Sequence, residues 1–279
     1  MNVGYVFAVL AALASGSGSI LESIGVRRAG AFGGTSMDLV GLRRQWIYFA
    51  GLGADLTGFV CAAAALRQLP LFLVQSVLAF SVGVTATIAT FLGTRLSPAG
   101  WLTLGVGATG LVLLGLSAEP SPAAAIESGW RWLLVGMAIP VATIAWRAKR
   151  RTGPWAASAL AFSTGLGFSI VGVSARTLQL PDSAWRLILE PSAWAIAVNG
   201  VVAAVVFAMA LQKGRPTGVT AIMFTTNTSL ASLIGLIYLD DRVRAGFDVA
   251  AATGFVCAVA GAIGVAHFAA IARQRSGAW

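Results

Sequence analysis

The segment 68–94, QLPLFLVQSVLAFSVGVTATIATFLGT, contains no Asp, Glu, Lys or Arg. An α-helix needs roughly 20 predominantly apolar residues to cross about 30 Å of hydrocarbon, and this segment is long enough. Eight further runs resemble it, one of them interrupted only by Asp55. The sequence therefore predicts an all-α polytopic membrane protein with nine transmembrane helices. The nine runs cover residues 3–21, 45–66, 68–94, 96–118, 132–146, 152–175, 191–212, 216–239 and 249–272.

The composition excludes a water-soluble domain. Hydrophobic residues make up 57% of the 279 residues and charged residues 10%, whereas a soluble domain carries roughly 25% charged residues. The chain has no P-loop, no nucleophile elbow and no HExxH element, so we expect neither an enzyme nor a cofactor. We assign no metal site from the sequence, and we expect the net charge of +9 to face lipid headgroups rather than nucleic acid.

The basic residues are unevenly distributed between alternate loops. Cytoplasmic loops carry an excess of Lys and Arg, which predicts an outside N-terminus and a cytoplasmic C-terminus. The Arg-rich composition favours a bacterial cytoplasmic membrane. If the shortest run, 132–146, did not span, the basic residues would divide almost evenly between the two faces. Of the 19 basic residues, 13 fall on one face: Arg27, Arg28, Arg43, Arg44, Arg95, Arg147, Lys149, Arg150, Arg151, Lys213, Arg215, Arg273 and Arg275.

An internal repeat emerges when the chain is displaced along itself by 146 or 147 positions. Pro70 then falls on Pro216, and Gly18 falls on Gly165. The displacement matches helices one to four with helices six to nine. A shift of five helices reverses the direction of crossing, so we predict two inverted-topology repeats joined by helix five. The expected boundaries are 1–118 for the first repeat, 119–151 for the linker helix with its basic loop, and 152–279 for the second repeat.

Two glycine-rich segments occupy corresponding positions in the predicted repeats. Ser17 lies in the first, SGSGS at 15–19, and Thr164 lies in the second, STGLG at 163–167. Helices interrupted in this way often line substrate sites of secondary transporters. Small residues also allow helices to pack closely without any substrate. The sequence leaves both interpretations open.

Acidic side chains inside the spans are the next candidates. Asp55 is deep within the second span, where a carboxylate costs several kcal/mol unless it is paired, hydrated or protonated. We interpret it as a proton relay or cation ligand, with a structural acid bonded to neighbouring hydroxyls as the alternative. Glu22 lies closer to the end of the first span. It is a transport residue or an interfacial partner of Arg27.

Uncharged polar residues cluster at midplane depth. Helix eight contains Thr226 and Asn227 within a run of five polar residues, helix seven contains Asn199, and helix three contains Gln75 and Ser81. Such residues line a cavity or form hydrogen bonds between helices, which average about 0.6 kcal/mol. Asn227 aligns with Ser81 under the repeat, so we expect these two residues and Asp55 to face one cavity.

Two pairs of motifs resemble known families. LGTRLS at 92–97, followed by GVGATGLVLL at 105–114, is similar to the drug/metabolite transporter superfamily with its EamA-type repeats. ADLTGF at 54–59 and LVQSVLAFS at 73–81 resemble the NIPA-like magnesium transporter branch. The resemblance implies two inverted repeats and a transport function. Thr94, Gly58 and Ser76 depart from the residues usual at these positions.

The leading hypothesis is a secondary transporter or exporter of a small polar metabolite that works by alternating access. A divalent-cation permease, a flippase for a lipid-linked sugar and a non-transporting membrane scaffold are the alternatives. The expected partners are membrane lipids and a small-molecule, ionic or lipid-linked substrate. The sequence does not indicate the oligomeric state.

Overall fold

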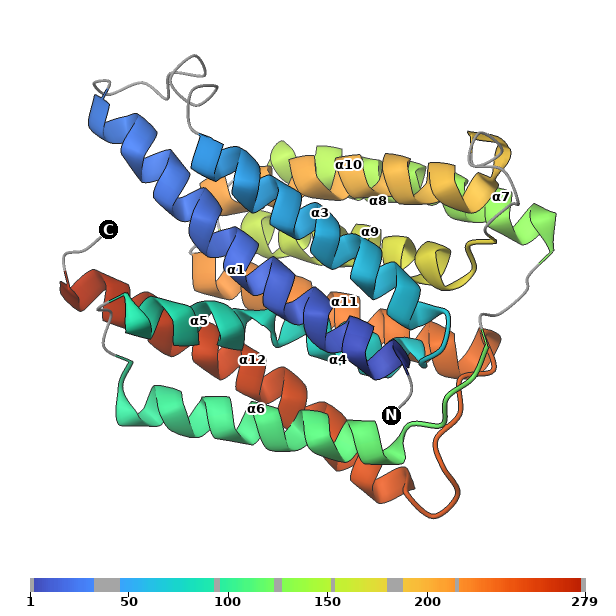
Figure 1. Cartoon of the computed structure of the whole chain (residues 1–279). Helices are drawn as coiled ribbons and strands as arrows, with labels where there is room; N and C mark the ends of the chain where they lie inside the picture. The colour runs from blue at the N-terminus through green and yellow to red at the C-terminus, as the bar shows by residue number, and fades with distance from the viewer. Residues whose placement is uncertain are drawn as a thin grey trace.

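The computed structural model describes residues 3–32, 46–92, 96–122, 127–151, 154–179, 188–213 and 216–276. Within these ranges the chain is helical apart from turns and one isolated antiparallel bridge between Ala118 and Val243. Most helices run side by side along one general direction (Figure 1). Their bounds are α1 Val3–Phe32, α3 Trp46–Leu66, α4 Leu71–Ala79, α5 Ser81–Phe91, α6 Pro98–Ser117, α7 Ser128–Gly136, α8 Ala138–Lys149, α9 Pro154–Arg176, α10 Pro191–Lys213, α11 Pro216–Tyr238 and α12 Asp248–Ser276.

Nine helical segments of the described chain are long and apolar enough to cross a membrane. They match the nine predicted runs in order. Two of them are formed by consecutive helices, α4 with α5 over Leu71–Phe91 and α7 with α8 over Gly129–Lys149. The all-α class and the nine apolar segments are thus confirmed for this part of the chain. They indicate a multi-pass membrane protein.

The fifth segment is longer than the predicted run of 132–146. Arg131, whose charge ended that run, lies inside α7 and forms an ion pair with Glu190 at 2.7 Å. The helix is interrupted at Met137 between α7 and α8. Pro140 follows three residues later, and a proline lacks a donor and clashes with the carbonyl of the residue four positions earlier, here Gly136. The interruption therefore has a local cause.

The first helix is also longer than predicted. The run of uncharged residues ends at residue 21, but α1 continues to Phe32. Arg27 and Arg28, which we placed in a loop, therefore belong to the helix. The composition of a span predicts where the apolar part ends, whereas the backbone hydrogen bonds of a helix can continue beyond it.

Both glycine-rich segments are continuous helix, so the interpretation as opened helices is wrong. A Cβ atom on Gly16 would lie 2.8 Å from the Ser81 carbonyl oxygen, and one on Gly165 would lie 2.8 Å from the Met223 carbonyl oxygen. The glycines thus allow α1 to approach α5 and α9 to approach α11. Close packing of small residues, the other interpretation, accounts for both segments.

Helices α6 and α12 form a second glycine contact. A Cβ atom on Gly110 would lie 2.7 Å from the Gly254 carbonyl oxygen, and one on Gly261 would lie 2.5 Å from the Gly107 nitrogen. Because the neighbouring atoms belong to the backbone, no side-chain rotation could relieve these contacts. The two helices lie together at the lower edge of the bundle in Figure 1.

Helix α4 occupies the centre of the bundle. It contacts α1, α6, α9, α11 and α12, and every side chain from Leu71 to Ser76 is buried. The helix is interrupted at Phe80, the single residue between the end of α4 and the start of α5. The Phe80 ring packs against Gly107 of α6. Polar residues on α4 are therefore enclosed by helices that are distant in the sequence.

Tryptophans near the helix ends are exposed to the surroundings of the bundle. This position is typical of the amphipathic rings that collect at membrane–water interfaces. The exposed tryptophans include Trp46, Trp101, Trp130, Trp132, Trp146, Trp155 and Trp194.

Candidate functional site

A pair of amide side chains joins α4 to α11 inside the bundle. Asn227 donates from Nδ2 to Gln75 Oε1 at 3.2 Å. Gln75 is 4% exposed, and its amide lies against Gly172 of α9, where a side chain would displace it. The amide pair, Gln75 and Asn227, thus lies at the junction of α4, α9 and α11. We expected both of these polar residues to lie at midplane depth, but we did not predict that they contact each other.

A buried ion pair lies one helical turn from the amide pair. Arg176 follows Gly172 by one turn of α9, and Leu71 precedes Gln75 by one turn of α4. The Arg176 guanidinium is fully buried and donates from Nη2 to Asp241 Oδ1 at 2.8 Å. Asp241 also accepts a hydrogen bond from the Leu71 backbone N–H at 2.6 Å. The amide pair and the ion pair therefore lie about one helical turn apart, and the ion pair is the nearer of the two to the end of the helices.

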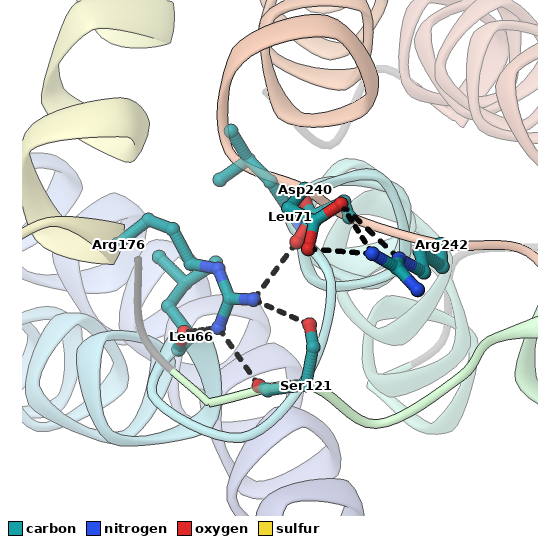
Figure 2. A network of polar contacts seen from close by, with 7 residues as sticks. Leu66, Leu71, Ser121, Arg176, Asp240 and Arg242 are labelled. Carbon is teal, nitrogen blue, oxygen red and sulfur yellow. Dashed lines mark hydrogen bonds and ion pairs between the residues drawn. The ribbon is translucent and has the colours of Figure 1, made fainter. Parts of the chain in front are cut away.

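Two further segments contribute to this network. Arg176 donates to the Leu66 carbonyl oxygen and, at 2.7 Å, to Ser121 Oγ. Figure 2 shows the guanidinium surrounded by these partners. We call Leu66, Leu71, Ser121, Arg176 and Asp241 the Arg176 cluster. It connects the α3–α4 turn, the segment after α6, the end of α9 and the loop after α11.

The end of α11 is shaped to place Asp241 in the cluster. Asp240 has a φ of 55°, a left-handed conformation that Asp adopts more readily than most residues. The chain then turns back, and the Asp241 N–H donates to the Gly235 carbonyl oxygen at 3.1 Å. A Cβ atom on Gly235 would lie 2.5 Å from Asp241 Oδ2. Glycine at this position leaves space for the carboxylate.

The electrostatic environment of the ion pair is dominated by burial. Burial raises the pKa of the Asp241 carboxyl, whereas the Arg176 guanidinium and the Leu71 N–H act to lower it. Removing one partner of a buried ion pair leaves an uncompensated charge and costs about 3–5 kcal/mol. The hydrogen bonds from Leu71 and to Ser121 help to offset the desolvation of both charges. The Arg176 cluster is therefore a strong connection only while it is complete.

A short antiparallel bridge reinforces the same end of the bundle. Arg244 N–H donates to the Ser117 carbonyl oxygen at 2.8 Å, and Glu119 N–H donates to the Arg242 carbonyl oxygen at 3.2 Å. Ala118 is the residue between these two bonds. The bridge fixes the end of α6 to the loop between α11 and α12. We call this end of the bundle, where α1 also begins, the Arg176 end.

Asp55 lies at the contact between α1 and α3. Its carboxylate packs against Gly18 of α1, where a Cβ atom would lie 2.5 Å from Asp55 Oδ1. Ser81 instead packs near Gly16. Residues two positions apart project from opposite faces of a helix, so α1 separates Asp55 from Ser81. Asp55 and Ser81 therefore contact different faces of α1, and Asn227 pairs with Gln75.

The other candidate residues have mainly structural contacts. Asn199 is buried and donates from Nδ2 to the Leu134 carbonyl oxygen at 3.0 Å. Thr226 packs on Gly165. Thr164 donates to the carbonyl oxygen four residues earlier, Ser17 to the one three residues earlier. The side chain of Glu22 lies outside the described part of the structure.

Sequence reasoning missed the Arg176 cluster because it treated these charges as interfacial. Arg176 and Asp241 each follow the end of an uncharged run, and both are predicted to lie on the same face of the membrane. Opposite charges in such positions can indicate an ion pair between two helix ends. Several acids occupy the same face, however, so the pairing could not be selected. It depends on the conformation of Asp240 and on a hydrogen bond from a backbone N–H.

Comparison of the chain with protein-family models, with curated proteins and with solved structures finds no match to any of them. The functional argument therefore rests on the geometry. Two amides can bind a polar solute by exchanging their mutual hydrogen bond for bonds to it. The Arg176 cluster holds the polar junction of α4, α9 and α11 together at one end.

Proposed function

We propose that the protein is a secondary membrane transporter of a small polar solute, with the junction of α4, α9 and α11 as its transport route. The observation that carries this proposal is the position of the amide pair, buried among α4, α9 and α11 one helical turn from the Arg176 cluster. Polar groups buried within an apolar bundle are costly unless they are satisfied. Their alignment from the interior to one end of the helices is the arrangement that a solute pathway requires.

The neighbour relations of the helices support two inverted halves. Helix α1 packs against α3 and α5, and the predicted counterpart α9 packs against α10 and α11. Helix α4 packs against α11, and α6 packs against α12, so each of these contacts joins a helix to its predicted counterpart. In an inverted-repeat arrangement, these pairings would correspond to a pseudo-twofold axis between α4 and α11, next to the amide pair.

Alternating access assigns a role to the Arg176 cluster. When the cluster is formed, the α3–α4 turn, the segment after α6, α9 and the loop after α11 are bonded together, and the Arg176 end is closed. Opening that end requires Arg176 and Asp241 to separate, and water then solvates both charges. The positive-inside rule places the basic loops in the cytoplasm. The Arg176 end accordingly faces the outside.

Asp55 is the proposed coupling residue. Its carboxylate lies at the contact between α1 and α3, where a change of protonation alters the packing against Gly18. A ligand or proton moves a conformational equilibrium only if it binds the two states differently. The α1–α3 contact provides this difference if α1 shifts relative to α3 during transport.

The experiment uses the full-length protein in proteoliposomes. Three probes are compared: a mixture of small polar metabolites with a proton-sensitive dye inside, Mg²⁺ with a magnesium dye, and a fluorescent phospholipid with an external quencher. We expect metabolite-dependent proton flux that Asp55→Asn abolishes and Thr57→Val leaves unchanged. Thr57 is exposed on the same helix and donates to the Gly53 carbonyl oxygen one turn earlier.

Each other outcome contradicts the proposal. Flux of Mg²⁺ alone supports a cation permease, and loss of phospholipid fluorescence alone supports a flippase. If all three signals equal those of protein-free vesicles, although the protein is inserted and folded, the chain is a scaffold.

A further inference from the structure

A cavity of about 340 Å³ lies between four helices near the Arg176 end. This volume falls within the roughly 300–1,000 Å³ range of small-molecule sites. It is separate from the junction of α4, α9 and α11 described above. The walls include Phe72 of α4, Leu114 of α6, Leu236 of α11 and Phe255 of α12. Its interior is almost entirely apolar.

The cavity opens toward the surroundings of the helices. Leu233 and Leu236 line it and are also 53% and 46% exposed. Both belong to the apolar segment Gly218–Tyr238, whose exposed side chains face hydrocarbon in a membrane-embedded bundle. The neighbouring exposed residues Ile237 and Val256 are likewise apolar. Molecules that reach the opening therefore come from the lipid phase.

One polar group inside the cavity lacks a hydrogen-bond partner among the described residues. Ser232 lines the cavity and is 6% exposed, and its buried Oγ is unsatisfied. Several buried hydroxyls donate to their own helix, as Ser76 and Thr164 do at 2.7 and 2.9 Å. Ser174, Ser192 and Thr228 also have a hydroxyl that is unsatisfied within the described chain, but they do not line this cavity. A bound molecule with a hydrogen-bond acceptor would satisfy Ser232.

The depth of Ser232 fits the ester region of a phospholipid. Six residues separate it from Tyr238 at the end of α11, about 9 Å along the helix axis. Asp248, at the start of α12, lines the cavity. The exposed Arg244 precedes it by four residues, and its guanidinium lies 5.8 Å from the Phe247 ring centroid. Basic residues at this level attract lipid phosphates.

We propose that this cavity binds one acyl chain of a glycerophospholipid. The chain occupies the space between α11 and α12, an ester carbonyl accepts a hydrogen bond from Ser232 Oγ–H, and the phosphate lies near Arg244. This site goes beyond the proposed transport activity and does not depend on it. A lipid held here fills the gap between α11 and the two helices α6 and α12, which pack closely through their glycines.

The test uses phosphatidylglycerol with a diazirine on its acyl chain, in nanodiscs containing the full-length protein. After illumination, labelled peptides are identified by mass spectrometry. We expect labelling concentrated in residues 229–236 and 248–255. Ala252→Trp, which fills the cavity, should lower this labelling about tenfold, and Ser232→Ala should lower it about fivefold through loss of one hydrogen bond. Ala260→Trp is the matched control, the same substitution at an exposed position two turns farther along α12.

Three results would overturn the proposal. The first is labelling spread evenly over the exposed faces of α1, α3 and α10. The second is an equal reduction by Ala252→Trp and Ala260→Trp. The third is equal labelling by a diazirine fatty acid at the same concentration, because a free acid has neither the ester nor the phosphate. Near-native melting of each variant shows that it is folded.

Discussion

The two ends of the helical bundle are held together by different kinds of interaction. At the Arg176 end, an ion pair with no exposed side-chain surface links segments that are far apart in the sequence. At the opposite end, which we call the basic end, Arg147, Lys149, Arg150 and Arg151 are exposed. Lys213 donates there to two backbone carbonyl oxygens, those of Lys149 and Arg151.

The difference between the two ends shows where breaking a contact between helices is costly. Buried charged groups have one favourable arrangement, and they lose several kcal/mol when that arrangement is broken. Exposed charges exchange protein partners for water at little cost, and such pairs contribute about 0–1 kcal/mol. We therefore expect the Arg176 cluster to break all at once, and the exposed contacts of the basic end to exchange one by one.

The largest expected effect follows from removing one charge at the Arg176 end. Arg176→Met should lower the free energy of unfolding by about 3–5 kcal/mol, because Asp241 remains buried without its partner. Denaturant titration in mixed micelles measures this change. The double variant Arg176→Met, Asp241→Leu should recover most of the loss.

The matched control is the exposed pair of Asp240 and Arg242 in the same loop, which are 79% and 66% exposed. Arg242→Met should change stability by less than about 1 kcal/mol. Equal losses for Arg176→Met and Arg242→Met would show that burial does not distinguish the two pairs.

A smaller effect should follow from adding one methyl group next to Asp241. Gly235→Ala places a Cβ atom 2.5 Å from Asp241 Oδ2, and overpacking of this kind costs about 1–3 kcal/mol. Gly218→Ala is the control on the same helix, where a Cβ atom meets nothing within 4 Å. Melting midpoints that shift equally for both variants would refute the assigned role of Gly235.

The amide pair should contribute less than the Arg176 cluster. A double-mutant cycle with Gln75→Leu and Asn227→Leu should give a coupling energy of about 0.6 kcal/mol, the mean for hydrogen bonds between membrane helices. Transport, in contrast, should be lost in both single variants. Coupling as large as that between Arg176 and Asp241 would make the amide pair a structural connection.

The smallest effect is expected at the basic end. Lys213→Met removes hydrogen bonds made by an exposed ammonium group, and such surface changes usually stay within about 0.5 kcal/mol. The same titration measures this variant. A loss comparable with that of Arg176→Met would remove the contrast between the two ends.

Much of the fold follows from uncharged runs, because the cost of burying charge in hydrocarbon is a property of composition. The ends of helices were less predictable: Arg131 lies within α7 because Glu190 neutralises it. The glycine-rich segments permitted two interpretations, and only their contacts with Ser81 and Met223 distinguish them. Local sequence does not specify which surface a small residue will meet.

The candidate site was predicted only in part. Gln75 and Asn227 were identified as polar residues at the right depth, since burial of an amide in an apolar helix demands a partner. The position of Asp55 against α1 depends on which face of α3 is turned inward, and the apolar residues of α3 leave that undetermined. The Arg176 cluster depends on a left-handed residue, Asp240, and no periodicity indicates it.

The central claim is that the Arg176 end must open for transport, and a disulfide across it tests this claim most directly. Ala118 and Val243 form the non-hydrogen-bonded pair of the antiparallel bridge. Such pairs have Cα atoms about 4.5 Å apart, within the range of roughly 4.4–6.8 Å that disulfides span. Ala118→Cys and Val243→Cys are introduced together after Cys61 and Cys257 have been replaced by alanine.

The measurement is solute flux in proteoliposomes before oxidation, after oxidation and after reduction. Each single-cysteine variant, oxidised in the same way, serves as the control. The account predicts that the disulfide stops flux and that reduction restores it, because the cross-link holds the Arg176 end closed. Unchanged flux with the disulfide fully formed would contradict the claim.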